Sequence, residues 1–249
     1  MISLTTDFDD FYVGQMKGII YKINPESKII DITHKIRRQS IYEASYVISN
    51  SYRYFPKNTI HIVVVDPGVG GSRDPILIEQ KDHIFIGPDN GIFSLIEGDI
   101  YKINTDELFN KLLTYGIHNI SNTFHGRDIF APAAALLDMG KRDFLEEKKH
   151  KIVLDFKRDI KKGSACASVL FVDIFGNVIL NIKKEDITTD QIELSNIKIP
   201  ILNNYEEGKS HELIALFSSS GHLEISKYLG NANSILNVNA GDTVLFKFR

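Results

Sequence analysis

The sequence has one cysteine, Cys166, among its 249 residues, and it has neither a CxxC pair nor an HExxH motif. A single cysteine allows no disulfide within the chain, which is typical of proteins from a reducing compartment. No apolar run approaches the ~20 residues that span a membrane. The first residues, MISLTTDFDD, lack the basic and apolar segments of a signal peptide. We therefore expect a cytoplasmic protein with no zinc site and no membrane partner.

A long basic stripe is also absent. The chain has 29 basic and 32 acidic side chains, which gives a formal net charge of −3. Its densest basic clusters, around residues 35–38 and 148–151, are short and have acidic or apolar neighbours. A nucleic-acid groove needs a longer run of positive charge, so we expect no nucleic-acid partner. The 43% hydrophobic content is ordinary for a folded globular protein.

Short runs rich in Ile and Val alternate with helical patterns through the first ~140 residues. The pattern predicts strands at 2–5, 29–32, 60–65, 76–79 and 83–86, and helices at 10–23, 40–54 and 128–139. Such alternation is typical of an α/β domain with a largely parallel sheet. We assign residues 1–150 to this domain.

From about Gly163 onward the sequence predicts strands without long helices. Turn residues separate the predicted strands at 165–172, 178–182, 191–194, 213–217, 222–226 and 243–248. This pattern favours a small antiparallel β-barrel domain over residues 163–249. The charged stretch 151–162 is the predicted linker.

Four polar clusters mark the candidate site. Three follow predicted strands, at residues 6–10, 66–73 and 87–91, and the fourth, 122–128, leads into the Ala-rich helix. In open α/β sheets, ligands bind outside the carboxyl ends of the strands. The joint placement of these clusters therefore predicts a functional site at that edge.

These residues alone leave three functions open. A divalent cation for phosphoester hydrolysis could be held by Asp7, Asp9, Asp10, Asp66, Asp89 and His125. Alternatively, Asp66, Arg73 and His125 could hold a water while other carboxylates face a cationic substrate. A non-catalytic nucleoside-binding module, which would bind a ligand without turnover, is the third alternative. The GVGG segment lacks the Lys-Ser/Thr of a P-loop, so it gives little support to nucleoside triphosphate binding.

A set of motifs resembles the S-adenosylmethionine hydroxide adenosyltransferases, which are related to fluorinating and chlorinating enzymes. The motifs are TTDF with the following YVG, VVDPGVGG, IGPDNG, TFHGRD with FAPAAA, and VDIFGN, in the order that the family has them. The resemblance covers nearly the whole chain. It implies hydrolysis of S-adenosylmethionine to adenosine and methionine without a cofactor, an N-terminal α/β domain and a C-terminal β-barrel. It also implies a homotrimer with active sites between neighbouring subunits.

The resemblance also implies roles for individual residues. Asp66, Arg73 and His125 match the family's water-handling triad. The resemblance assigns Asp7 to the ribose, Asp10 to the methionine amino group, and Phe124 to an aromatic position beside the substrate. It assigns Asp173 and Asn177 to contacts with methionine and adenine. Ser219, Glu224 and Lys227 match positions in the segment that, in the family, closes over the methionine carboxylate and adenine.

Two positions separate the chain from its halogenating relatives. Asp66 stands where the fluorinating enzymes have a neutral tyrosine, and Gly126 stands where they have a serine. The chlorinating enzymes share the glycine, so Asp66 is the stronger discriminator. We therefore expect a hydrolase, with a halogenase as the related alternative.

Overall fold

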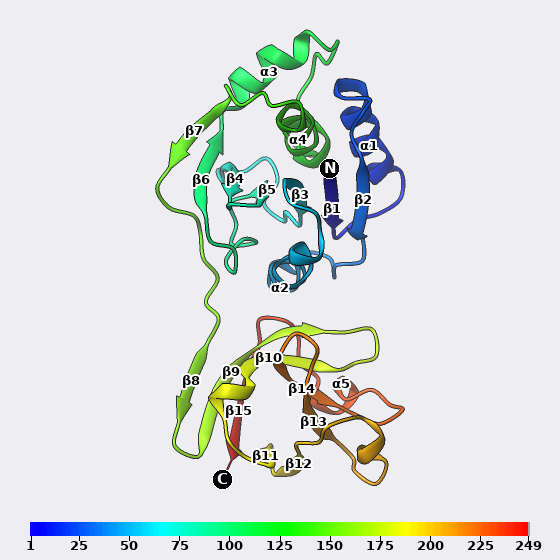
Figure 1. The fold of residues 1–249 in the computed structure, drawn as a ribbon, viewed down its shortest axis with the longest axis vertical. Coiled ribbons are helices and arrows are strands. Elements are labelled where there is room, and N and C mark those ends of the chain that lie inside the picture. Colours follow the sequence, from blue (N-terminus) through cyan, green and yellow to red (C-terminus); the bar gives the residue numbers. More distant parts are fainter. Residues whose placement is uncertain (249) are drawn as a thin grey trace. The chain divides into compact units, whose positions relative to one another are not determined.

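The computed structural model describes residues 1–248 and forms two compact units, one spanning Met1–Leu154 and the other beginning at Asp155. Figure 1 shows the fold of both units as a ribbon, and each unit buries hydrophobic side chains of its own. None of the helices in the described part of the chain has the length and apolar character needed to cross a membrane.

The first unit is a seven-stranded sheet with helices on both faces. Its strands are β1 (Ile2–Thr6), β2 (Ile29–Thr33), β3 (Thr59–Val64), β4 (Pro75–Glu79), β5 (His83–Pro88), β6 (Asp99–Ile103) and β7 (Leu145–Lys148). Its helices are α1 (Phe11–Ile23), α2 (Ile41–Ser51), α3 (Thr105–Leu113) and α4 (Ala131–Asp138), with a 3₁₀ turn at Tyr52–Tyr54 and a π-helical turn at Gly126–Phe130.

The sheet is mixed, with the strand order β2-β1-β3-β5-β4-β6-β7. The strands β2, β1, β3 and β5 run parallel, whereas β4, β6 and β7 join them in antiparallel pairs. The prediction of a largely parallel sheet therefore holds only in part. Residues 80–82 leave too short a connection between β4 and β5 for a crossover, so these two strands form a hairpin.

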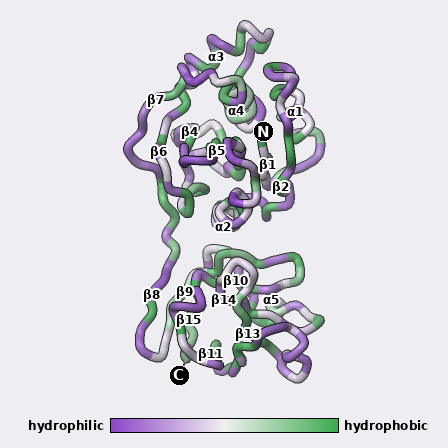
Figure 2. The backbone as a smooth tube through the Cα atoms, in the orientation of Figure 1, coloured by the Kyte–Doolittle hydropathy of each residue, from purple (hydrophilic) through white to green (hydrophobic). Residues whose placement is uncertain are grey.

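Side chains at alternate positions of the central strands pack into a hydrophobic core on each face of this sheet. Leu4 and Ile62 pack in the core that includes residues of α1 and α4, whereas Val63 and Phe85 pack in the core that includes residues of α2. The residues of α4 are mostly hydrophobic, whereas those of the edge strand β7 are mostly hydrophilic (Figure 2). Charged edge strands discourage pairing with another chain.

Strand register places the candidate site. In the parallel pair of β1 and β3, Thr6 lies beside Val64. The carboxyl ends of β1, β3 and β5 therefore meet at one edge of the sheet. The loops that carry Asp7, Asp66 and Asp89 start from this edge.

The second unit is an antiparallel sheet of eight strands that nearly closes on itself. Its strand order is β12-β11-β15-β9-β10-β14-β13, β8 pairs with β9, and a bridge between Ile201 and Ala215 joins the two ends. The barrel-like form agrees with the prediction. Its elements are β8 (Arg158–Lys161), β9 (Ser164–Val172), β10 (Val178–Lys183), β11 (Gln191–Leu194), β12 (Ile197–Pro200), β13 (Ile214–Phe217), β14 (His222–Ser226), α5 (Asn233–Leu236) and β15 (Thr243–Phe248), with 3₁₀ turns at Lys184–Asp186 and Glu206–Gly208.

Candidate active site

A cleft of about 410 Å³ lies at the carboxyl edge of the first unit's sheet. Its walls come from the loops after β1 and β3, from the segment before the π-helical turn, and from nearby side chains. The lining residues are Asp7, Phe8, Tyr12, Gln39, Val64, Asp66, Pro67, Val69, Thr123, Phe124, His125 and Gly126. The structure thus brings four of the predicted site residues, Asp7, Asp66, Phe124 and His125, to one cleft.

Asp66, Arg73 and His125 form a hydrogen-bonded row. Arg73 Nε donates to both carboxylate oxygens of Asp66 at 3.1 and 3.0 Å, and Nη2 donates to Oδ2. The same Nη2 lies 2.6 Å from His125 Nδ1. The side chains of Arg73 and Asp66 are only 8% and 5% exposed, so this ion pair is shielded from solvent. Arg73 also lies over the Phe130 ring, 5.6 Å from its centroid.

The contact with Arg73 fixes the protonation of His125. A guanidinium group only donates hydrogen bonds, so His125 Nδ1 must be the acceptor and the ring proton must sit on Nε2. Burial and the positive charge of Arg73 both lower the pKa of His125, while Asp66 and Asp128 oppose the shift. The imidazole is therefore neutral at physiological pH.

A close approach of two backbone segments brings Asp66 and His125 together. Gly70 has a φ of +77°, and a Cβ atom there would lie 2.2 Å from the carbonyl oxygen of Asn122. Only glycine allows this contact without displacing the loops. At the strand end, Asn90 Nδ2 donates to the carbonyl oxygen of Val65 at 2.9 Å, which anchors the residue just before Asp66.

The buried carboxylate of Asp128 holds the segment that carries Phe124 and His125. Its Oδ2 accepts a hydrogen bond from Ser121 N at 2.8 Å. Arg127 donates to both oxygens, with Nε–Oδ1 at 2.6 Å and Nη2–Oδ2 at 2.8 Å, and the guanidinium lies 5.2 Å from the Phe124 centroid. The hydrogen bond to Asp128 raises the pKa of Arg127 further. The two charged residues of the HGRD motif therefore position their neighbours.

Aromatic side chains form another wall of the cleft. The Phe124 ring makes edge contacts with Phe8 and Tyr12, at centroid distances of 5.7 and 5.3 Å. The sequence analysis singled out Phe124 and missed Phe8 and Tyr12. Their place inside the TTDF and YVG motifs is the signal that could have identified them.

The two acidic residues predicted to bind substrate from the first loop differ in position. Asp7 lines the cleft, and its Oδ2 accepts a hydrogen bond from Gln39 N at 2.7 Å. Asp10 is exposed at the N-cap of α1, with a φ of 65°, and does not line the cleft.

In the second unit, Asp173 and Asn177 form a tight turn between β9 and β10. Asp173 Oδ1 accepts from the backbone N–H groups of Phe175 and Asn177 at 2.9 and 2.8 Å, and Oδ2 accepts from Asn177 Nδ2 at 2.9 Å. Asn177 and Lys227 line a cavity of about 610 Å³ within this unit, together with Phe175, Tyr205, Tyr228, Leu229 and Gly230.

Glu224 and Ser219 have different surroundings. Glu224 is buried on β14, where its Oε1 accepts from Tyr205 Oη and Ser226 Oγ, each at 2.7 Å. Burial and this contact raise the pKa of Tyr205. Ser219 is exposed in the turn between β13 and β14 and does not line the cavity.

The residues of the metal hypothesis do not form a metal-binding cluster. Across residues 1–248, no group of three or more His, Cys, Asp and Glu side chains lies close enough to hold a metal ion. Asp89 instead accepts a hydrogen bond from Ile152 N at 2.8 Å and lies 3.4 Å from Lys148 Nζ. Asp9 is exposed.

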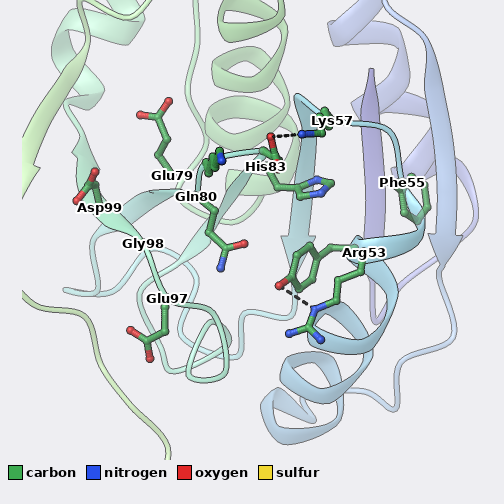
Figure 3. A pocket seen from close by; sticks show the side chains of 12 residues that line it. Arg53, Phe55, Lys57, Glu79, Gln80, His83, Glu97, Gly98 and Asp99 are labelled. Atoms are coloured by element: carbon green, nitrogen blue, oxygen red, sulfur yellow. Dashed lines mark hydrogen bonds and ion pairs between the residues drawn. The ribbon is translucent and has the colours of Figure 1, made fainter. Parts of the chain in front are cut away.

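A larger hollow, of about 800 Å³, lies at the opposite edge of the sheet, near the amino ends of β3 and β5 (Figure 3). Two of its basic side chains have partners: Lys57 Nζ lies 3.1 Å from Asp82 Oδ1, and Arg53 Nε donates to Tyr52 Oη at 3.1 Å. None of the predicted site residues lines this hollow. A large volume alone does not identify an active site.

Comparison with known proteins adds independent evidence. The family model for the SAM hydroxide adenosyltransferase N-terminal domain matches residues 2–146, and the model for the C-terminal domain of the same family matches residues 167–245. The (R)-S-adenosyl-L-methionine hydrolase of Methanocaldococcus jannaschii is 35% identical, over 98% of this chain and 94% of the relative. A fluorinase from Nocardia brasiliensis is 22% identical, over 96% of this chain and 93% of the relative.

A solved structure shares the fold. An uncharacterized conserved protein from Thermotoga maritima aligns with a TM-score of 0.86 and 35% identity, covering 99% of this chain and all of the other. Together, the comparisons confirm the resemblance that the sequence motifs indicated, over both units.

Proposed function

This chain belongs to the SAM hydroxide adenosyltransferase family, and on that premise we propose that it hydrolyses S-adenosyl-L-methionine to adenosine and L-methionine. The observation that supports this proposal best is the Asp66–Arg73–His125 row, two members of which line a cleft with Asp7 and Phe124. The row supplies fixed polar groups to orient a water, and the rest of the cleft offers groups to hold a cationic nucleoside.

The cleft suits a sulfonium cation. Phe8, Tyr12 and Phe124 present aromatic surface, and the negative face of an aromatic ring attracts a cation. Asp7 adds a carboxylate at the same cleft, where the family resemblance assigns it to the ribose hydroxyls. The sulfonium end and the sugar end of the substrate would therefore each have a complementary partner.

In the proposed reaction, a water held against Asp66 attacks C5′ in line with the C5′–S bond. The O–C5′ bond forms as the C5′–S bond breaks, and sulfur keeps the bonding electron pair as the thioether of methionine. Because the leaving group departs as a neutral thioether, no general acid is needed. Holding the water in an attack geometry lowers the barrier by several kcal/mol through orientation.

Asp66 is the group that accepts the proton from the attacking water. The Nδ1 lone pair of His125 is already engaged by Arg73, and Nε2 carries the ring hydrogen, so His125 has no free acceptor. A carboxylate oxygen has more than one lone pair and can accept a proton while Arg73 holds the group in place. His125 then orients the water or the ribose as a hydrogen-bond donor.

The remaining roles follow the family resemblance. We propose that Asp10 and the second unit's Asp173, Asn177, Ser219, Glu224 and Lys227 contact the substrate, and that the chain assembles into a cytoplasmic homotrimer in which a neighbouring subunit supplies substrate contacts. The proposed reaction needs no metal or other cofactor, because an oriented water and a sulfonium leaving group suffice.

Product analysis tests this proposal. Purified protein incubated with S-adenosylmethionine and EDTA should release adenosine and methionine in equal amounts, resolved by chromatography. Asp66→Ala serves as the inactive comparison and should turn over roughly 10²- to 10⁴-fold more slowly, as is typical of acid–base groups. Binding without turnover would instead support a nucleoside-binding module, and turnover restored only by added metal would support a metal-dependent hydrolase.

A further inference from the structure

A second cavity, of about 630 Å³, lies on another side of the triad. Arg73 and His125 both line it, whereas Asp66 does not. The other lining residues are mostly polar or small, among them Gly70, Asn122, Lys102, Asp106, Thr105 and Asn119. We refer to it as the rear cavity, to distinguish it from the substrate cleft.

The two spaces are lined by adjacent residues of the same two segments. Val69 and Thr123 line the substrate cleft, and the adjacent residues Gly70 and Asn122 line the rear cavity. Gly70 packs directly against the Asn122 carbonyl group. His125 lines both spaces, so its side chain lies between them.

One nitrogen of the Arg73 guanidinium group makes no hydrogen bond to residues 1–248. Its Nη1 atom is buried and has no hydrogen-bond partner among the described residues, and the whole side chain is only 8% exposed. The Nε and Nη2 groups are already used by Asp66 and His125. Buried N–H groups are seldom left without an acceptor, so a small polar molecule that accepts a hydrogen bond from Nη1 is expected here.

The charges around the rear cavity favour water over an anion. Arg73 is neutralised by Asp66, and Lys102 Nζ lies 2.8 Å from Asp74 Oδ1. Asp106 adds a further acidic side chain to the wall. A water occupies about 30 Å³, so the cavity has room for a connected group of waters.

We propose that the rear cavity is a water reservoir that supplies the nucleophile to the Asp66–Arg73–His125 row. This inference rests on the proposed hydrolysis, which consumes one water and releases one proton in each cycle. In-line attack requires the water to approach C5′ from the side opposite the sulfur. A substrate bound in the cleft would hinder the entry of water through the cleft itself. A water on Arg73 Nη1 would therefore reach the row after the substrate has filled the cleft.

Tryptophan scanning of the cavity wall tests the proposal. Thr105→Trp and Asn119→Trp fill the rear cavity from different segments without altering the triad, and Asn110→Trp is the matched control on the same helix as Thr105, outside the cavity. Because the natural sequence has no tryptophan, blue-shifted indole emission reports directly that the new side chain is buried.

We expect each filled variant to lose at least fivefold in kcat while its Kd for S-adenosylmethionine stays within twofold of the unaltered enzyme, and the control to match the unaltered enzyme in both. A buried indole with unchanged kcat would overturn the reservoir. A crystal structure of Asp66→Asn with substrate bound gives a second test: ordered water on Arg73 Nη1 supports the proposal, and an anion or a dry cavity contradicts it. If the unaltered enzyme releases no adenosine, the proposed function itself fails; if it does and the filled variants match it, only the reservoir fails.

Discussion

Replacement of Arg73 by lysine preserves the positive charge and removes the geometry on which the site depends. The guanidinium group reaches both oxygens of Asp66 and the Nδ1 of His125 at once, through Nε and Nη2. A lysine ammonium is a single point of charge on a differently shaped side chain. It can keep a contact with Asp66 and cannot hold both oxygens and the imidazole.

The expected loss follows from the contacts removed. A hydrogen bond to a charged group contributes about 1.5–3 kcal/mol. If Arg73→Lys keeps the ion pair and loses one such bond that orients the triad, kcat should fall roughly 10- to 150-fold, since each 1.4 kcal/mol corresponds to about a factor of ten. Substrate affinity should change less, because Arg73 does not line the substrate cleft.

The chain offers a closely matched control in Arg142→Lys. Arg142 also makes a two-pronged contact with a carboxylate, with Nη1 and Nη2 at 3.1 and 2.5 Å from the two oxygens of Glu79, and it also lies over an aromatic ring, Tyr101. That pair is exposed, 41% for Arg142 and 33% for Glu79, and lies outside the site. Exposed ion pairs contribute about 0–1 kcal/mol, so Arg142→Lys should leave kcat unchanged. Steady-state kinetics showing near-native kcat for Arg73→Lys would refute the role of the guanidinium contacts with Asp66 and His125.

Three further predictions follow from charge and assembly. Because burial and Arg73 lower the pKa of His125, the acid limb of kcat should have its midpoint below the ordinary 6.5, and a midpoint above 7 would contradict the neutral tautomer. His61 is fully buried. Burial, with a smaller effect of His83, lowers its pKa to about 3. Below pH 6.5 the unfolded chain therefore gains a proton at His61 that the folded chain does not. At about 1.4 kcal/mol per pH unit over 1.5 units, the free energy of unfolding should fall by about 2 kcal/mol between pH 7 and pH 5. Urea titrations should show less of this loss for His61→Gln and the full loss for the exposed control His118→Gln; equal losses would rule out His61 as the source. Light scattering should give the mass of a trimer, and a fully active monomer at assay concentration would disprove the shared site.

Much of the fold could be predicted because its central elements have clear patterns. The buried strand Thr59–Val64 and the helix Phe11–Ile23 agree with the predicted ranges to within a residue or two. The strands Leu145–Lys148 and Arg158–Lys161 were missed, because these charged segments lack the apolar pattern of a strand and are strands through their pairing. The first pairs with the distant strand Asp99–Ile103, and the second forms a hairpin with the strand that follows it, Ser164–Val172. The helix Thr105–Leu113 was also missed, although Asn104 caps it by accepting hydrogen bonds from the second and third residues that follow it.

The candidate site was predictable in composition and less so in arrangement. Motifs identified Asp66, Arg73 and His125, and the structure places them in one hydrogen-bonded row. No sequence pattern could show that Arg73 lies between the other two, or which nitrogen of His125 accepts, because these depend on contacts between segments 52 residues apart. The catalytic roles themselves remain predictions until variants are assayed.

Isotope labelling of the product tests the central claim most directly. The enzyme is incubated with S-adenosylmethionine in H₂¹⁸O containing EDTA and molar sodium chloride, and the nucleosides are analysed by mass spectrometry. If Asp66 and Arg73 hold a water that attacks C5′, adenosine should carry ¹⁸O at its 5′ position, with no 5′-chloro-5′-deoxyadenosine. Unlabelled adenosine, or a chlorinated nucleoside formed at a comparable rate, would contradict the account.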